Sequence, residues 1–393
     1  MLVTKRNIGI IIVLMIYIIL VPYSQLYNIN LLARIVATIF LGVGLLYGSG
    51  KLNYTYIIFV STIIGIPSIF ILMQSFFIQN VNCLSSWLAR CLACFCAIYI
   101  YKSIGFRLFL NTLKWIMVVD VIGVFIWLAL GIVQQSNIPG FNYLISYASV
   151  SQLVYINGND ILSNRYTAFT TNPNLFGFIS ACGALSLIWK MKMSYKFGWW
   201  LVFVFAAFMH QSRAAILFVL CFYFIHYSIL LRGVVKKLTL MLFVLLIGIL
   251  TFSVLFEMRG TTEFESGRYS GSMIMMNIFL SGSISEMLFG IGYNELGEST
   301  LGTSLYLMTD NSYIPLLVEN GIVGVLFLII PCIMFAVYVI RKNSIPLINW
   351  LPFTISFFIY SMIENAIYGI TQSYLWTIWL LYLMDYKIKK EQC

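Results

Sequence analysis

The sequence is poor in charged residues. Only 9% of its 393 residues are Asp, Glu, Lys or Arg, whereas 61% are hydrophobic and the mean hydropathy is +0.94. A soluble protein carries about a quarter charged residues. Because so few charged side chains cannot cover a folded surface in water, the composition excludes a soluble globular protein and predicts that lipid is the solvent.

Residues that bind metals or nucleic acids are also scarce or wrongly placed. The chain has two histidines, His210 and His226, and no cluster of His, Cys and carboxylates with metal-ligand spacing. We therefore predict no metal site and no other cofactor, with magnesium held by carboxylates alone as the open alternative. The net charge of +10 comes from short basic clusters between apolar runs. That pattern indicates cytoplasmic loops facing anionic membrane lipid and argues against nucleic-acid binding.

The apolar runs predict an all-α integral membrane protein, a single transmembrane domain over residues 1–393. About twelve windows are long enough to cross a bilayer, which takes about 20 residues of helix. They are residues 7–23, 30–48, 55–76, 84–101, 108–133, 173–190, 197–211, 213–231, 238–256, 312–340, 346–363 and 367–386. The seventh is short and runs almost into the eighth.

Two long polar stretches interrupt these windows, at residues 134–172 and 257–311. Long loops in a compact protein are usually functional. We expect both to be extracytoplasmic and to contribute to a site. The second is expected to contain a short helix of its own, around Tyr269 to Leu280.

The basic residues predict the orientation. If the amino terminus is cytoplasmic and twelve helices follow, both termini are cytoplasmic, and 17 of the 23 basic residues, every lysine among them, fall on the inner side. The remaining six are all arginines at or near the outer face: Arg34, Arg90, Arg165, Arg213, Arg259 and Arg268.

This bias toward arginine on the outer side suggests bidentate recognition of phosphate or carboxylate. Arg34 and Arg90 lie a turn or two inside their helices, where a charge is costly unless it faces a polar cavity. The alternative is that each arginine pairs with an acidic residue of this chain. The candidates are Asp160, Glu257, Glu263, Glu265 and Glu286.

Four segments on the predicted outer side carry most of the polar residues. In the first, Arg165 precedes Asn172-Pro173-Asn174, with Asn172 a predicted helix N-cap and Pro173 the first helical residue. A helix start of this kind favours an anion. The second segment is the Ser212-Arg213 pair between two apolar windows.

The third and fourth segments follow further along the chain. The third contains Gly267-Arg268 and then Gly290-Ile291-Gly292, whose glycines permit a tight turn. The fourth contains Asp310-Asn311-Ser312-Tyr313 and then Glu319-Asn320-Gly321-Ile322-Val323-Gly324. Taken alone, each of these patterns is a weak signal.

Together and in this order, the segments resemble the O-antigen polymerase and ligase superfamily of bacterial membrane glycosyltransferases. Its pattern is an Arg before Asn-Pro-Asn, a Ser-Arg pair, a Gly-Arg opening a large periplasmic loop, a Gly-Ile-Gly, and a polar-Asn-x-aromatic stretch before Glu-x-Gly-Ile-x-Gly. The matches run from Arg165 to Gly324, less than half of the chain. The resemblance implies a GT-C-like helical bundle in the bacterial inner membrane with a periplasmic active site.

The ligase branch of that superfamily typically carries a histidine at the position of Asp310. Because this chain has an aspartate at that position, the resemblance favours the polymerase branch, the Wzy-type enzymes. The resemblance then implies joining of oligosaccharide repeat units carried on undecaprenyl pyrophosphate into a surface polysaccharide, either O-antigen or capsule. A chain-length regulator is a possible partner.

The candidate site residues follow from these segments. Arg213 and Arg268 are expected to stabilise the pyrophosphate leaving group, and Asp310 or Glu319 to act as general base. The other arginines and four further polar residues are expected to bind substrate: Arg165, Arg34, Arg90, Arg259, Asn172, Asn174, Asn311 and Tyr313.

Two other functions stay open at this point. An O-antigen ligase would require an essential histidine, and His210 is the one near the predicted outer face. A flippase or other transporter of lipid-linked oligosaccharide also suits twelve helices, although transporters usually show repeat symmetry and short loops. We find no internal repeat in this sequence.

Overall fold

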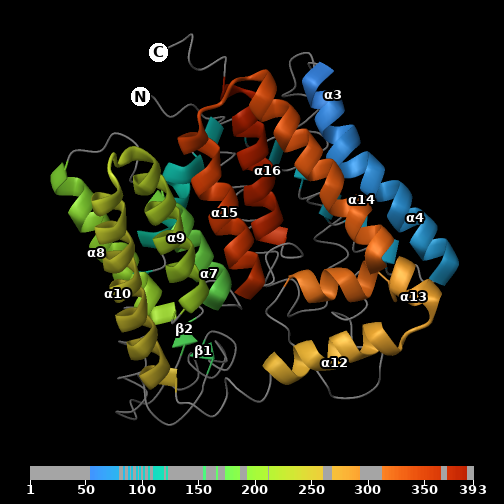
Figure 1. Cartoon of the computed structure of the whole chain (residues 1–393), viewed down its shortest axis with the longest axis horizontal. Coiled ribbons are helices and arrows are strands. Elements are labelled where there is room, and N and C mark those ends of the chain that lie inside the picture. The colour runs from blue at the N-terminus through green and yellow to red at the C-terminus, as the bar shows by residue number, and fades with distance from the viewer. Residues whose placement is uncertain are drawn as a thin grey trace, which may run out of the picture. The chain divides into compact units, whose positions relative to one another are not determined.

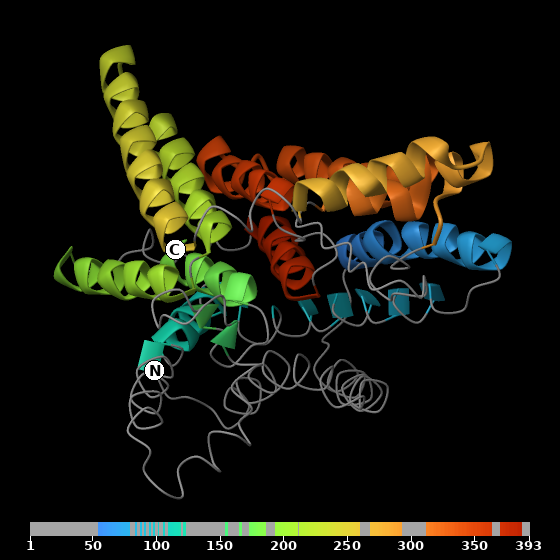
Figure 2. The same ribbon diagram turned by 90° about the horizontal axis from the view of Figure 1, so that it is seen from below.

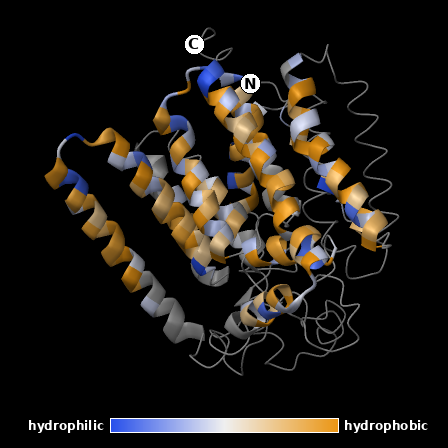
Figure 3. Ribbon diagram, turned by 45° about the vertical axis from the view of Figure 1, so that its right-hand side comes forward, coloured by the Kyte–Doolittle hydropathy of each residue, from blue (hydrophilic) through white to orange (hydrophobic). Residues whose placement is uncertain are grey.

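The computed structural model of the chain is predominantly helical. It describes residues 54–78, scattered helical positions between 83 and 122, residues 154–155, 165–166, 173–185, 193–210, 212–259, 268–292, 312–363 and 370–386. Three described helices are long and apolar enough to cross a membrane: Tyr56–Ile78, Arg213–Leu230 and Tyr313–Lys342. Figure 3 shows hydrophobic residues along the helices and hydrophilic residues gathered near helix ends. The chain is thus helical, with helices suited to lipid.

The described helices coincide with predicted apolar windows. α7 (Pro173–Leu185), α8 (Met193–His210), α9 (Arg213–Leu230) and α10 (Val234–Arg259) follow one another, and α15 (Leu347–Ile363) and α16 (Ile370–Met384) close the series (Figure 1). α8 begins four residues before its window of 197–211. The windows 7–23 and 30–48 lie outside the described residues, so the number twelve stays a prediction.

The polar stretches contain secondary structure of their own. α12 (Arg268–Ser281) confirms the helix predicted around Tyr269 to Leu280, and the short α13 (Ile284–Phe289) follows it. In the other stretch, β1 (Val154–Tyr155) pairs antiparallel with β2 (Arg165–Tyr166), with Tyr155 opposite Arg165. The sequence pattern did not predict this pair of strands.

The chain divides into two compact units. Unit 1 comprises residues 1–33, 106–261 and 351–360, and unit 2 comprises residues 34–105, 262–350 and 361–393. Within unit 1, α7 packs against α8 and α9, and α9 packs against α10. Its core is aromatic: the Tyr360 ring stacks on Phe178 at 4.5 Å and meets Phe218 edge-on at 5.8 Å between ring centroids. This packing fixes the start of α9 beside α7.

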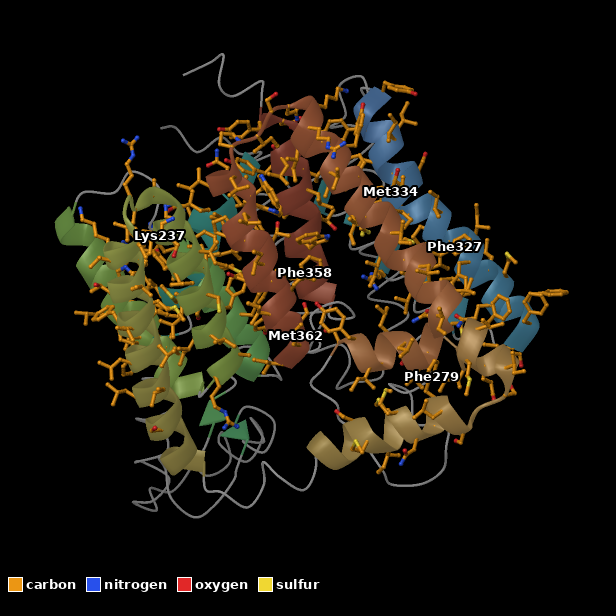
Figure 4. All side chains as sticks on the ribbon, viewed as in Figure 1. Lys237, Phe279, Phe327, Met334, Phe358 and Met362 are labelled. Carbon is orange, nitrogen blue, oxygen red and sulfur yellow. The ribbon has the colours of Figure 1, made fainter. Side chains whose placement is uncertain are left out.

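Unit 2 is built on two interrupted helices. The first comprises α3 (Tyr54–Val60), the π-helical turn η1 (Ser61–Gly65) and α4 (Ile66–Ile78), and Pro67, which has no amide to donate, follows the π turn. The second is α14 (Tyr313–Lys342). Phe70 of α4 stacks on Phe327 of α14, labelled in Figure 4, at 5.8 Å between centroids. α12 and α13 pack beside α14 (Figures 1 and 2).

Candidate functional site

The predicted site residues fall into three groups. Four lie outside the described residues, namely Arg34, Asn172, Asp310 and Asn311. Four have a described backbone but side chains outside the description: Arg165 in β2, Asn174 in α7, Arg259 at the end of α10 and Arg268 at the start of α12. The four whose side chains are described are Arg90, Arg213, Tyr313 and Glu319.

In unit 1 the structure brings the first two segments together at the start of α9. Ser212 is the N-cap of this helix, and its side-chain oxygen accepts a hydrogen bond from the Ala215 amide at 3.4 Å. Gly177, in the second turn of α7, lies so close that an added Cβ would be 2.4 Å from Ser212 Cβ. Pro173 is the first residue of α7, as predicted. The two segments therefore share one end of a helix pair.

Arg213 is the first residue of α9 and is 7% exposed. The amino-terminal end of a helix carries partial positive charge, which repels a guanidinium. Burial adds a further cost because it removes the charge from water. A buried arginine at this position is therefore disfavoured by local helix electrostatics, and the position favours an anion close by.

The carboxyl-terminal end of α9 is followed by exposed cations instead of a buried one. Arg232, Lys236 and Lys237 follow the end of the helix at Leu230, and all three are exposed; Lys237 is labelled in Figure 4. An α-helix rises about 1.5 Å per residue, so the 18 residues of α9 separate these cations from Arg213 by about 27 Å. Unit 1 thus has one exposed basic end and one end with a buried arginine.

In unit 2 the fourth segment coincides with a break in α14. Gly321 has φ 63° and ψ −178°, outside helical geometry, so the helix is interrupted between Asn320 and Ile322. Residues 322–342 alone extend about 31 Å, which matches the hydrocarbon thickness of a bilayer. The single window predicted at 312–340 is therefore a spanning helix preceded by a short separate helical segment.

The third segment packs against this break. Ile291 and Gly292 donate backbone hydrogen bonds to the carbonyl oxygens of Val318 and Glu319, at 3.1 and 3.0 Å. An added Cβ on Gly290 would be 2.1 Å from Glu319 O, and one on Gly321 would be 2.4 Å from Leu288 O. Both glycines have positive φ, 79° and 63°. The Gly-Ile-Gly turn and the break at Gly321 form one close backbone contact, which we call the glycine junction.

The remaining described site residues surround this junction or lie deeper in unit 2. Glu319, in the last turn before the break, is 3% exposed. Tyr313, in the first turn of α14, is half-buried and its side chain is hydrogen-bonded to Ser361. The guanidinium carbon of Arg90 lies 5.8 Å from the centroid of the Trp87 ring, which belongs to the core of unit 2.

The opposite end of unit 2 repeats the basic pattern of unit 1. Arg341 and Lys342, in the last turn of α14, are exposed. Tyr56, near the start of α3, donates a hydrogen bond to the Asp385 carboxylate at 3.1 Å, and Asn343 donates to the carbonyls of Leu383 and Met384. The helix ends at residues 54, 342 and 384 therefore meet on one side of unit 2, away from the glycine junction.

α13, which ends at Phe289 beside the glycine junction, has a complete cap at its amino-terminal end. Ser283 and Glu286 form a capping box, in which Glu286 Oε2 accepts from the Ser283 amide at 2.7 Å and from its hydroxyl at 2.8 Å. These bonds, the backbone one first, hold the pKa of the Glu286 carboxyl below its usual range. Because Glu286 is engaged within its own helix turn, we assign it a structural role.

Two residues that build these contacts were not predicted from the sequence. Gly177 looked like an ordinary residue of an apolar window, and its close approach to Ser212 becomes visible only in the packed helices. Gln74 can be recognised as unusual in the sequence, because it is the one amide side chain in the apolar run of α4. A polar residue inside a membrane helix is costly and usually has a partner.

No protein-family model matches the chain, and no curated protein matches it.

Proposed function

We propose that the protein is a membrane glycosyltransferase that polymerises oligosaccharide repeat units carried on undecaprenyl pyrophosphate into a surface polysaccharide. It acts on the extracytoplasmic face of the bacterial plasma membrane, as a bundle of about twelve helices with both termini cytoplasmic. A chain-length regulator is a possible partner. The resemblance of the four segments to the O-antigen polymerases is the starting point of the proposal.

The observation that carries it is the buried Arg213 at the amino-terminal end of α9. A cation at the first position of a helix is disfavoured by the helix dipole, and burial adds to the cost. An anionic ligand beside Arg213 offsets part of that cost, in addition to the contacts that Arg213 makes within the protein. A pyrophosphate, whose negative charge grows as the glycosidic bond breaks, gains from donors that are already fixed in place.

The distribution of basic residues supports the orientation. Exposed cations mark one end in each unit: Arg232, Lys236 and Lys237 in unit 1, and Arg341 and Lys342 in unit 2. The positive-inside rule assigns such ends to the cytoplasm. Arg213 and the glycine junction lie at the opposite ends of their own units, which supports an extracytoplasmic position for both.

The reaction is one displacement. A sugar hydroxyl of the acceptor unit attacks the anomeric carbon of the donor chain, the bond to the pyrophosphate oxygen breaks, and undecaprenyl pyrophosphate leaves with the electron pair. By the resemblance of the four segments, Arg165, Arg213 and Arg268 are assigned to the leaving group. Glu319 or Asp310 takes the proton of the attacking hydroxyl. Asn172, Asn174, Asn311 and Tyr313 bind sugar hydroxyls.

A transporter of the same lipid-linked substrate is the second candidate, and the break in α14 favours it, since transporters often bind substrate at broken helices. Those breaks lie near the middle of the membrane. The break at Gly321 leaves about 31 Å of unbroken helix on one side, enough to span the bilayer by itself. A break that leaves a full span on one side favours an interfacial site and hence the transferase.

Reconstitution separates the two functions. Purified protein in liposomes, given only lipid-linked repeat units, is expected to produce a ladder of lengthened chains on electrophoresis. Movement of the substrate between leaflets without lengthening would instead identify a transporter. Chain growth that persists in EDTA is expected as well, because the arginines supply the positive charge that a divalent metal supplies in other transferases.

A further inference from the structure

The glycine junction receives a side chain from a distant part of the sequence. Gln74, in α4, is 1% exposed and lies 215 residues before Phe289 and 245 before Glu319. Its Nε2 donates to the carbonyl oxygen of Phe289 at 2.6 Å and to that of Glu319 at 2.7 Å. One amide group therefore bonds both halves of the junction.

The break in α14 explains why such a donor is needed. In an unbroken helix the carbonyls of Val318 and Glu319 accept from amides four residues later, and the non-helical Gly321 interrupts that ladder. Unsatisfied carbonyls are costly away from water. Here Val318 O accepts from the Ile291 amide, and Glu319 O accepts from Gly292 and Gln74.

α4 supports the break on both of its sides. Phe70, one turn before Gln74, packs so closely on Gly324 that an added Cβ would be 2.5 Å from the ring. Gln74 then binds the last turn before the break. The carboxyl-bearing residue Glu319 is thus held through its own backbone, between the Gly-Ile-Gly turn and α4.

We infer that Gln74 is a positioning residue: its amide fixes the backbone of Glu319 against the Gly-Ile-Gly turn and so sets where the Glu319 side chain stands during transfer. The kinetic part of this inference rests on the proposed function. The structural part does not rest on it. That part is the pair of hydrogen bonds from Gln74 Nε2 to the carbonyls of Phe289 and Glu319, which we call the clamp.

The test compares Gln74→Leu and Gln74→Glu with Ser68→Ala. Gln74→Glu keeps the length of the side chain, Gln74→Leu is one atom shorter, and both remove the amide donors. Ser68→Ala is the matched control on the same helix, because Ser68 accepts from Trp87 Nε1 at 2.8 Å and does not touch the junction. Each protein is purified as the full chain in detergent and in liposomes.

Hydrogen exchange tests the clamp without any assumption about activity. The amides of residues 288–292 are expected to exchange about tenfold faster in both Gln74 variants, because losing a hydrogen bond of ordinary strength allows the turn to open. Exchange in Ser68→Ala is expected to match the wild type there. Unchanged exchange in the Gln74 variants would overturn the clamp, whatever the protein does.

Steady-state kinetics tests the positioning role. Both Gln74 variants are expected to lose about 100-fold in kcat with KM within about threefold, because a small displacement of a catalytic group costs rate more than binding. A wild-type kcat together with faster exchange would reduce Gln74 to a structural residue. If the wild type does not lengthen chains at all, the proposed function fails, and the exchange experiment still decides the clamp.

Discussion

The two units hold their polar segments together by different physical means. In unit 1 two helices approach side by side, with Gly177 of α7 against the Ser212 cap of α9. In unit 2 a turn and a helix break meet through their backbones, at Gly290 and Gly321. The glycines of unit 2 are explained by geometry alone. The arginine that follows Ser212 needs other contacts to offset its cost, because a cation at a helix start is disfavoured.

The comparison separates the residues of the polar segments that are informative about function from those that are not. Glycine and serine positions in both units are required by close contacts and by a cap, so they would persist in a protein with any activity. Arg213 and the buried Glu319 are costly where they stand. The contacts explain the small residues, whereas the proposed function gives Arg213 and Glu319 a role beyond the contacts that both make within the protein. Four predictions test this division, from the largest expected effect to the smallest.

The first is that Gly290→Ala and Gly321→Ala each destabilise the protein by about 4 kcal/mol or more, because the new Cβ overlaps backbone atoms and the positive φ adds strain. Gly233→Ala is the matched control: its φ is also positive, at 100°, but an added Cβ meets nothing within 4 Å. Thermal unfolding in detergent measures the difference. Equal losses at Gly233 and Gly290 would show that contact plays no part.

The second is that Arg213→Ala lowers the rate of chain lengthening by about 10²- to 10³-fold while the protein still reaches the membrane, as expected when a preorganised donor is removed. Arg213→Lys is expected to recover only part of the rate, because an ammonium cannot bind phosphate in a bidentate manner. Arg232→Ala, on the opposite exposed end of α9, is the control and is expected to leave the rate unchanged.

The third is that Gly177→Ala destabilises unit 1 by about 1 to 3 kcal/mol, the usual cost of an overpacked contact. Its added Cβ would lie 2.4 Å from Ser212 Cβ and 2.6 Å from Ser212 Oγ. Because both atoms belong to one side chain, Ser212→Gly in the same chain should recover much of the loss. A double-mutant cycle by thermal unfolding gives the coupling, and strictly additive losses would place the strain elsewhere.

The fourth and smallest concerns the start of α13. Ser283→Ala removes the hydroxyl of the capping box and is expected to cost about 1 kcal/mol of local stability at neutral pH. The folded pKa of Glu286 is depressed, so its contribution is present above the unfolded value and disappears as the pH falls through the folded value. Hydrogen exchange of residues 284–289 should thus differ between variant and wild type at pH 7. The difference should narrow in acid, where the bond from Ser283 Oγ to the carboxylate is lost and only the cap bond from the Glu286 amide distinguishes the two proteins.

Much of the helical organisation could be predicted from the sequence, because membrane helices follow directly from long apolar runs. The start of α7 at Pro173 and the presence of α12 were also predictable, since both depend on local signals. The β1–β2 pair was missed because two-residue strands leave no periodic pattern. The prediction of a single transmembrane domain stays a prediction.

The contacts that build the site could not be predicted in the same way. Gly321 lies in an apolar window that reads as continuous helix, and only the turn at Gly290 gives a reason for breaking it. Gln74 stands out as polar, yet its partners are more than 200 residues away in sequence. Spacing along the chain identifies which residues are unusual, while packing decides which of them meet.

The most direct test of the central claim measures the leaving group itself. Release of undecaprenyl pyrophosphate from lipid-linked repeat units is followed in sealed liposomes that contain wild-type protein, Arg213→Ala or Arg232→Ala. We predict one carrier released per unit added, at equal rates in wild type and Arg232→Ala and at least about 100-fold more slowly in Arg213→Ala. Equal release in all three, or none in the wild type, would contradict the account.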